Sequence, residues 1–184
     1  MHKILKRTAA ALATLALIAL CAAFTLFKLI QKRIDNHAPH LVARNIPAAD
    51  LHFQTLDGNP HALSDYKGKV VFLDLWGTWC IQCVAEMPTV QKLYDHYRGD
   101  PNVQFLIVSR LDTPTKVERY ARINRFDLPF YVTRDQDIPD SMYLHQYPAT
   151  FLYTKDGLLA AQHAGGANWS DASVIHFIDQ LRAN

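Results

Sequence analysis

The first strong pattern along this 184-residue chain is an apolar run near its start. Residues 8–27, TAAALATLALIALCAAFTLF, contain no charged side chain, and Lys28 follows directly. A helix rises about 1.5 Å per residue, so a run of this length spans about 30 Å, the thickness of a bilayer core. The pattern predicts an N-terminal signal anchor or transmembrane helix over residues 1–30. A mixed polar tether over 31–47 and one folded domain over 48–184 are expected to follow.

The same run leaves the fate of the anchor open. The residues CAA at 21–23 resemble a signal-peptidase site, but Phe24, Leu26 and Phe27 continue the apolar run beyond them. This length favours an uncleaved anchor. Lipidation at Cys21 is the third alternative, and it is less favoured because Leu20 is not a small residue. An N-terminal basic and apolar segment is the usual export signal, so we expect the domain outside the cytoplasm.

Beyond residue 48, strand and helix patterns alternate. Strands are predicted around the Asp57-Gly58 turn, in the almost wholly apolar run KVVFLDLW at 69–76, in VQFLIVS and in LPFYVTR, and in a late hairpin that begins with PATFLYT. Helices are predicted at about 80–98, 113–124, 137–147 and 170–181. This alternation predicts an α/β fold with a central mixed sheet flanked by helices.

Charge and cysteine content narrow the chemistry. The net charge is only +2, and no Lys/Arg cluster marks the domain, so nucleic-acid binding has no support. Two of the three cysteines, Cys80 and Cys83, lie three positions apart in WGTWCIQCVAEMP. A zinc site needs two more ligands, and a disulfide across so short a loop removes little chain entropy. A C-x-x-C pair behind a strand in an α/β pattern favours redox chemistry, with no metal and no bound cofactor.

The predicted position of this pair explains how it reacts. At the start of a helix, the spacing of Cys80 and Cys83 places both sulfurs on one side of the first turn. The unpaired N–H groups and the positive end of the helix dipole stabilise a thiolate there. A thiolate is the species that attacks a disulfide. We therefore expect a lowered pKa for the Cys80 thiol.

The segment FLDLWGTWCIQCVAEMP resembles the active site of the thioredoxin superfamily, in the form found in its TlpA/ResA-like branch of membrane-anchored thiol-disulfide oxidoreductases. LHFQTLDGNPHALSDYKGKVV is similar to the N-terminal strands of that branch, and YPATFLYTKDGLLAAQHAG to its cis-proline strand and hairpin. The resemblance implies a thioredoxin-like fold. It also implies that Cys80 is the exposed nucleophile and Cys83 the buried resolving thiol.

Two acids are candidates for proton transfer. Glu86 lies one turn after Cys83, where poor solvation would raise its pKa and allow it to take the proton of Cys83. Asp74 is the one charged residue inside an apolar strand, where a carboxyl is costly unless it is paired or protonated. It matches the buried acid of thioredoxin. The alternatives are an exposed first-turn acid for Glu86 and a strand-end hydrogen bond for Asp74.

Three residues are candidates for substrate binding. The resemblance implies that Pro148 is a cis-proline facing the cysteines. Its neighbour Tyr147 then offers backbone groups to an extended substrate segment. Trp79 is expected in an exposed apolar rim around Cys80, and Trp76 in the core.

The partners follow partly from the chemistry and partly from the resemblance. Neither Ile81 nor Gln82, between the cysteines, adds a positive charge, so we favour a reductant. The resemblance implies protein thiols or disulfides as partners, such as an apocytochrome or another exported protein. It also implies a membrane electron carrier for recycling, and single-pass anchoring in the bacterial cytoplasmic membrane with the domain in the periplasm. The alternative is a Cu(I) metallochaperone that uses the two thiolates, with Met87 nearby.

Overall fold

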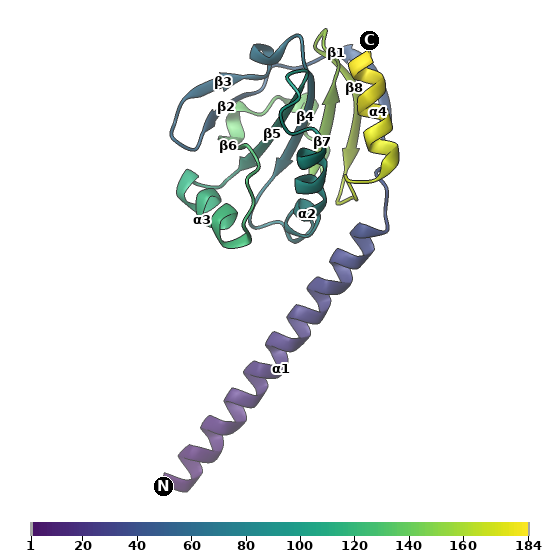
Figure 1. Ribbon diagram of the computed structural model, residues 1–184. Helices are drawn as coiled ribbons and strands as arrows, with labels where there is room; N and C mark the ends of the chain where they lie inside the picture. Colours follow the sequence, from purple (N-terminus) through teal and green to yellow (C-terminus); the bar gives the residue numbers. More distant parts are fainter. Residues whose placement is uncertain (1, 184) are drawn as a thin grey trace.

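A computed structural model describes residues 2–183, with the side chains of residues 2–6 and 8–10 left outside the description. Its centre is one mixed sheet of eight strands in the order β1-β8-β7-β4-β5-β6-β2-β3 (Figure 1). The strands are β1 Val42–Pro47, β2 His52–Thr55, β3 Pro60–Ala62, β4 Val70–Trp76, β5 Val103–Arg110, β6 Phe130–Thr133, β7 Ala149–Tyr153 and β8 Leu158–Ala164. The helices are α1 His2–Asp35, α2 Ile81–His96, α3 Pro114–Asn124 and α4 Ala172–Ala183. The predicted α/β fold is confirmed.

Strand β4 lies at the centre of the sheet, and all seven of its residues are buried. It pairs in parallel with β5 and antiparallel with β7, so both of its edges are hydrogen-bonded. On one face, Phe72 and Trp76 join a core that includes residues of α2, α3 and α4. On the other face, Leu73 and Leu75 pack with residues of η1 Leu63–Tyr66 and of the segment before β7. This burial on both faces explains why the strand reads as an unbroken apolar run.

One predicted helix is absent. The segment 137–147 contains only the short 3-10 helix η3 Asp140–Met142, preceded by η2 Asp135–Asp137. Pro139 is extended, with φ −60° and ψ 142°, and it lacks the N–H that a continuous helix would need there. Met142 is buried in the core that contains Leu73 and Leu75, so the segment covers that face of the sheet without a regular helix.

The predicted tether at 31–47 also differs from the structure. Helix α1 continues to Asp35, and residues 42–47 form β1, which pairs antiparallel with β8. The strand forms because β8 offers an open sheet edge that it can pair with, and the register shifts once, between Ala43 and Ile46. Only the stretch between α1 and β1 is irregular, and even there the His37 carbonyl accepts the Asn168 N–H at 2.8 Å.

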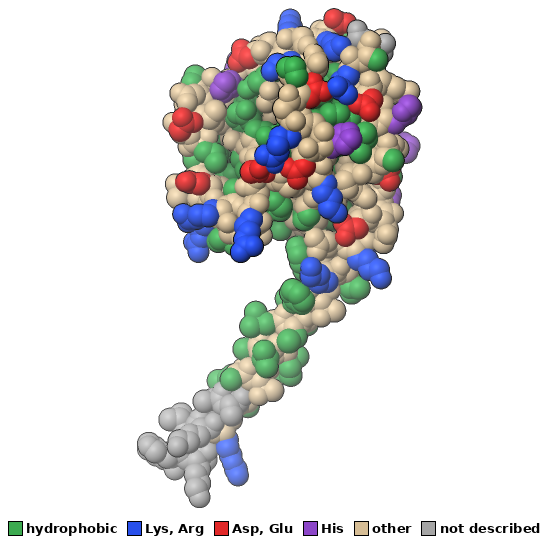
Figure 2. Space-filling model, viewed as in Figure 1, with side chains coloured by type: hydrophobic (Ala, Val, Ile, Leu, Met, Phe, Trp, Pro, Cys, Tyr) green, Lys and Arg blue, Asp and Glu red, His purple; other side chains and the backbone are tan. Residues whose placement is uncertain are grey.

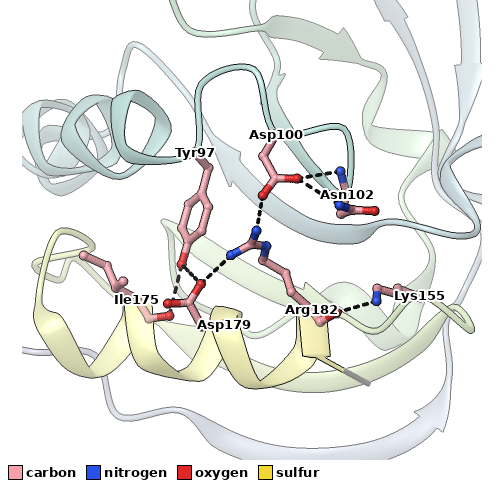
Figure 3. A network of polar contacts seen from close by, with 7 residues as sticks. All are labelled: Tyr97, Asp100, Asn102, Lys155, Ile175, Asp179 and Arg182. Atoms are coloured by element: carbon pink, nitrogen blue, oxygen red, sulfur yellow. Dashed lines mark hydrogen bonds and ion pairs between the residues drawn. The ribbon is translucent and has the colours of Figure 1, made fainter.

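A charged network fastens the last helix to the loop before β5 (Figure 3). Arg182 pairs with Asp179 of α4 and with Asp100 of the loop that precedes β5. The Tyr97 hydroxyl donates to the Ile175 carbonyl at 3.0 Å and lies 3.1 Å from Asp179 Oδ1. The Arg182 guanidinium thus lies between two carboxylates of opposite charge to its own.

Candidate functional site

The site lies at the carboxyl ends of the central parallel strands β4 and β5. The chain leaves β4 at Trp76, turns through residues 77–79 and enters α2 (Figure 1). The Asp112 carboxylate, which follows β5, fixes this turn by accepting the backbone N–H of Thr78 at 2.8 Å and its hydroxyl at 2.9 Å. A Cβ on Gly77 would overlap the Trp79 ring, so only glycine fits at the start of the turn.

Cys80 and Cys83 are joined by a disulfide, with their Cα atoms 5.3 Å apart. Cys80 is the N-cap residue of α2, and its sulfur accepts the Cys83 backbone N–H at 3.2 Å. The Cys83 N–H is one of the backbone donors that the start of a helix leaves without an intrahelical partner. It already donates to the sulfur that would carry the negative charge after reduction. Cys83 is fully buried and Cys80 is 8% exposed, so Cys80 is more enclosed than the sequence suggested.

Glu86 is fully buried one turn after Cys83. Its Oε2 accepts the Ala167 backbone N–H and the Trp169 Nε1–H, both at 2.9 Å. Its other oxygen, Oε1, has no hydrogen-bond partner among the described residues. Burial raises the pKa of Glu86 well above its usual range, and the nearby Asp74 carboxyl raises it further.

Asp74 is also fully buried, in the middle of the sheet. Its Oδ1 accepts the Thr150 hydroxyl from the neighbouring strand β7 at 3.2 Å, and Oδ2 has no partner among the described residues. Burial raises the pKa of Asp74 from its ordinary value of 3.8 to about 7, although the Thr150 hydrogen bond opposes this. The two acids thus share one dry region in which a proton is held near neutral pH.

An aromatic surface borders the cysteines on the side of β7. Trp79 is 48% exposed, as expected for a rim residue, and its ring lies edge-on to the Tyr147 ring with centroids 5.8 Å apart. The peptide bond between Tyr147 and Pro148 is cis. The Arg110 guanidinium lies 4.6 Å from the centre of the Tyr147 ring, and its backbone carbonyl accepts the Trp79 Nε1–H at 3.2 Å. Arg110 thus holds both aromatic side chains in place.

The structure places the cysteines, Trp79 and the cis-proline near the carboxyl end of β4, with Asp74 inside that strand. Besides Arg110, it adds three residues that sequence reasoning missed. Thr150 binds Asp74, Trp169 binds Glu86, and Asp112 fixes the turn before Cys80. Asp112 carried a signal, because a carboxylate directly after a parallel strand lies at the edge where sites form. Trp169 carried none, because it lies more than eighty positions from its partner.

The same region offers little to a metal ion. Among residues 2–183, no group of three or more His, Cys, Asp or Glu side chains is placed to hold a metal ion. Met87, the further sulfur considered for copper, is fully buried in the core.

Comparison with known proteins agrees with this geometry. Residues 42–162 match the model of the AhpC/TSA family. The chain is 36% identical over 116 residues to thiol-disulfide oxidoreductase ResA of Geobacillus kaustophilus, covering 63% of this chain and 66% of that protein. It is 32% identical over 158 residues to ResA of Bacillus thuringiensis subsp. konkukian, covering 81% and 84%.

A solved structure described as a thiol-disulfide oxidoreductase of Bacteroides vulgatus superposes with a TM-score of 0.64 at 31% identity. The match covers 73% of this chain and 94% of that one, and it confirms the thioredoxin-like fold. The disulfide at the start of α2 lies within the region that all these matches share. This chain therefore belongs to the AhpC/TSA family and to the ResA-like thiol-disulfide oxidoreductases.

Proposed function

We propose that this protein reduces disulfides of exported proteins outside the cytoplasm, through Cys80 and Cys83. The observation that carries the proposal is the Cys80 sulfur at the N-cap of α2, which accepts the Cys83 N–H, in a residue that keeps 8% exposure while Cys83 has none. A buried structural disulfide needs neither feature. The family named above supports the same reaction class.

The proposed cycle begins with the dithiol form. The Cys80 thiolate attacks one sulfur of the partner's disulfide, which forms a mixed disulfide and releases the other partner sulfur as a thiolate. The Cys83 thiolate then attacks the Cys80 sulfur, restores the internal disulfide and releases the second partner thiolate. Two electrons pass from the protein to the partner, whose thiolates take up two protons.

The buried acids supply a path for the proton of Cys83. Cys83 has no exposed surface, so water does not take its proton directly. Glu86 lies one helical turn away, and both acids have raised pKa values. In the proposed role, the pair accepts the Cys83 proton as Cys83 attacks and returns it when the protein is reduced again.

Binding of the partner is assigned to the aromatic surface beside the cysteines. Trp79 and Tyr147 offer apolar contact, and the strand end at Pro148 offers backbone groups to an extended segment. An apocytochrome is one candidate partner, and a dithiol carrier in the membrane would reduce Cys80–Cys83 again. Helix α1 supports anchoring, because Ala11–Asp35 is long and apolar enough to cross a membrane.

Trapping in intact cells tests this function. A Cys83→Ser variant cannot resolve the mixed disulfide, so partners should accumulate on Cys80 and be identifiable by mass spectrometry. Cys80→Ser is the matched control and should trap far less, because Cys83 is wholly buried. Equal trapping by both variants, or by neither, would contradict the proposal. Trapped species that arise from oxidation of a dithiol partner would reverse the assigned direction.

A further inference from the structure

The loop 165–169, between β8 and α4, contacts the active site and the N-terminal helix with alternate residues. Ala167 and Trp169 donate to Glu86, as described above. Asn168, between them, faces the other way, and its side-chain Nδ2 donates to the Asp35 carbonyl at the end of α1 at 2.8 Å. One short loop therefore holds both the active-site acid and the end of the anchor helix.

An apolar contact strengthens this attachment. Ile34 is only 5% exposed, although most of the apolar side chains of α1 are exposed. Its Cδ1 lies 2.9 Å from where a Cβ on Gly166 would be, so glycine lets the helix approach the loop closely. The Gln82 Cβ lies 3.4 Å from the same point. Since Gln82 stands between the two cysteines, the last turn of α1 lies beside the disulfide.

A groove of about 340 Å³ runs along this junction. The groove is lined by Ile30 and Arg33 of α1 and by Ile81 and Gln82 at the start of α2. The site is thus bounded by the anchor helix on one side and by the aromatic surface on the other.

The attachment also determines how far the disulfide stands from a membrane. The apolar run ends at Phe27, and Lys28 marks the start of the polar region. From Lys28 to Ile34 the helix rises about 9 Å. A rigidly attached domain therefore keeps its cysteines close to the lipid headgroups.

The side of the domain that carries the cysteines also faces the membrane end of α1. In Figure 1, α3 and the start of α2 lie on the side of the domain towards which α1 extends. Figure 2 shows Lys and Arg side chains where the apolar stalk meets the domain and along its lower edge. Four of the exposed large apolar side chains lie at the start of α2 and in or before α3, namely Trp79, Ile81, Leu111 and Ile123, and two more, Val42 and Ile46, lie on β1. Exposed cations of α3 and the residue after it are Lys116, Arg119, Arg122 and Arg125.

From these observations we propose that the docked end of α1 is a fixed wall of the active site, and that it holds the disulfide facing the bilayer surface. The membrane dithiol carrier of the proposed cycle fits this placement if its reacting cysteines lie at headgroup level. The inference rests on the proposed exchange through Cys80. It adds the location of one partner class and a positioning role for Ile34, Gly166 and Asn168.

A lipid-bound probe tests the placement. The reduced full-length protein, carrying Cys21→Ser to remove the third thiol, is placed in vesicles that contain phosphatidylethanolamine with a pyridyl disulfide on its headgroup. The Cys80 thiolate attacks the probe and releases thiopyridone, and Cys83 then releases the lipid thiol by closing the internal disulfide. Two protein thiols are oxidised as one probe disulfide is reduced to two thiols. A soluble pyridyl disulfide provides the reference rate.

Two insertions of equal length separate a fixed helix from a flexible tether. Seven helix-forming residues after Leu29 lift a docked domain by about 10 Å and turn it by only about 20°. We expect the ratio of lipid-probe rate to soluble-probe rate to fall about tenfold, because the headgroup no longer reaches Cys80. Seven Gly/Ser residues between Ala38 and Pro39 lie beyond the docked end of α1, and we expect the ratio to stay unchanged.

Each other outcome overturns part of the inference. If both insertions lower the ratio equally, or neither does, α1 is not a fixed wall and the domain moves on a tether. If the original protein reacts no faster with the lipid probe than with the soluble one at equal bulk concentration, its active site does not face the membrane. Loss of reaction with the soluble probe would instead contradict the proposed function itself.

Discussion

Two polar clusters of this protein differ in how they treat charge. Around Arg182, carboxylates and a guanidinium alternate, and the charges lie partly in solvent (Figure 3). Around Glu86 and Asp74, two carboxyl groups are buried completely, and no cation among the described residues is bonded to either. The first arrangement stabilises the ionised groups, whereas the second makes ionisation costly.

The contrast separates a structural cluster from one suited to proton transfer. The hydrogen bond from the Asn102 backbone N–H lowers the pKa of Asp100, and the Arg182 charge lowers it further, so this carboxylate stays charged near neutral pH. The buried pair instead holds a proton near neutral pH, and it does so at the expense of stability. Raised carboxyl pKa values in a dry site next to a nucleophile are a common mark of function. Three experiments test this difference, in order of decreasing expected effect.

The largest effect concerns stability against pH. Folded Asp74 keeps its proton up to about pH 7, whereas the unfolded chain loses it near 3.8. The folded state therefore binds more protons over this interval, and stability falls as pH rises, by about 4 kcal/mol for a shift of this size. Urea unfolding of the oxidised protein at about pH 5 and about pH 8 measures the part of this loss that falls between the two conditions, about 3 kcal/mol, because the folded group keeps its proton from pH 5 to about pH 7. We expect a clearly smaller loss in Asp74→Asn.

Asp100→Asn is the control from the other cluster. The pKa of Asp100 is lowered, so its contribution is present above its unfolded pKa and is lost only in acid, below about pH 3.8. This variant should keep the full loss between the two test conditions. Equal pH slopes in the original protein and in Asp74→Asn would contradict the role given to burial of Asp74.

The second effect concerns turnover. Glu86→Gln keeps an oxygen to accept the Ala167 and Trp169 N–H groups but cannot take up a proton. We expect disulfide reduction to slow by about 100-fold near neutral pH, as is typical when a general acid–base is lost. Reduction of insulin disulfides measures the rate, and near-ultraviolet circular dichroism checks the fold. Glu118, the other glutamate of the chain, is exposed on α3, so Glu118→Gln is the matched control. An unchanged rate in Glu86→Gln would remove Glu86 from the proton path.

The smallest effect belongs to the paired cluster. Arg182→Met removes the cation between Asp100 and Asp179 but keeps much of its apolar stem. Because these groups are partly solvated, the loss of unfolding free energy should be no more than about 1 kcal/mol. Insulin reduction should proceed at the original rate. A marked change in turnover would show that the two clusters are coupled across the domain.

Local sequence patterns predict much of this architecture. The apolar run of β4, the Thr113 and Pro114 start of α3 and the C-x-x-C at a helix start all depend on neighbouring residues, so the sequence predicts them directly. Contacts between distant segments could not be predicted in this way. The pairing of β1 with β8 and the hydrogen bond from Trp169 to Glu86 exist only after the sheet has formed.

The residues of the site also divide into those with a local sequence signal and those without one. The cysteines and both acids stand out by spacing or by an unexpected charge, and the cis peptide at Pro148 followed from the family resemblance. Arg110 carried no comparable signal, because an arginine at the end of a strand usually faces solvent. Its contact with the Tyr147 ring became apparent only in three dimensions.

The place of β1 in the sheet affects how this domain can be produced without its membrane helix. A chain shortened to begin at residue 48 would lose all of β1 and leave the long edge of β8 unpaired. Such an edge offers free N–H and C=O groups to a second molecule, which favours aggregation. A soluble version should therefore begin before Val42, so that the segment after the anchor still protects the sheet.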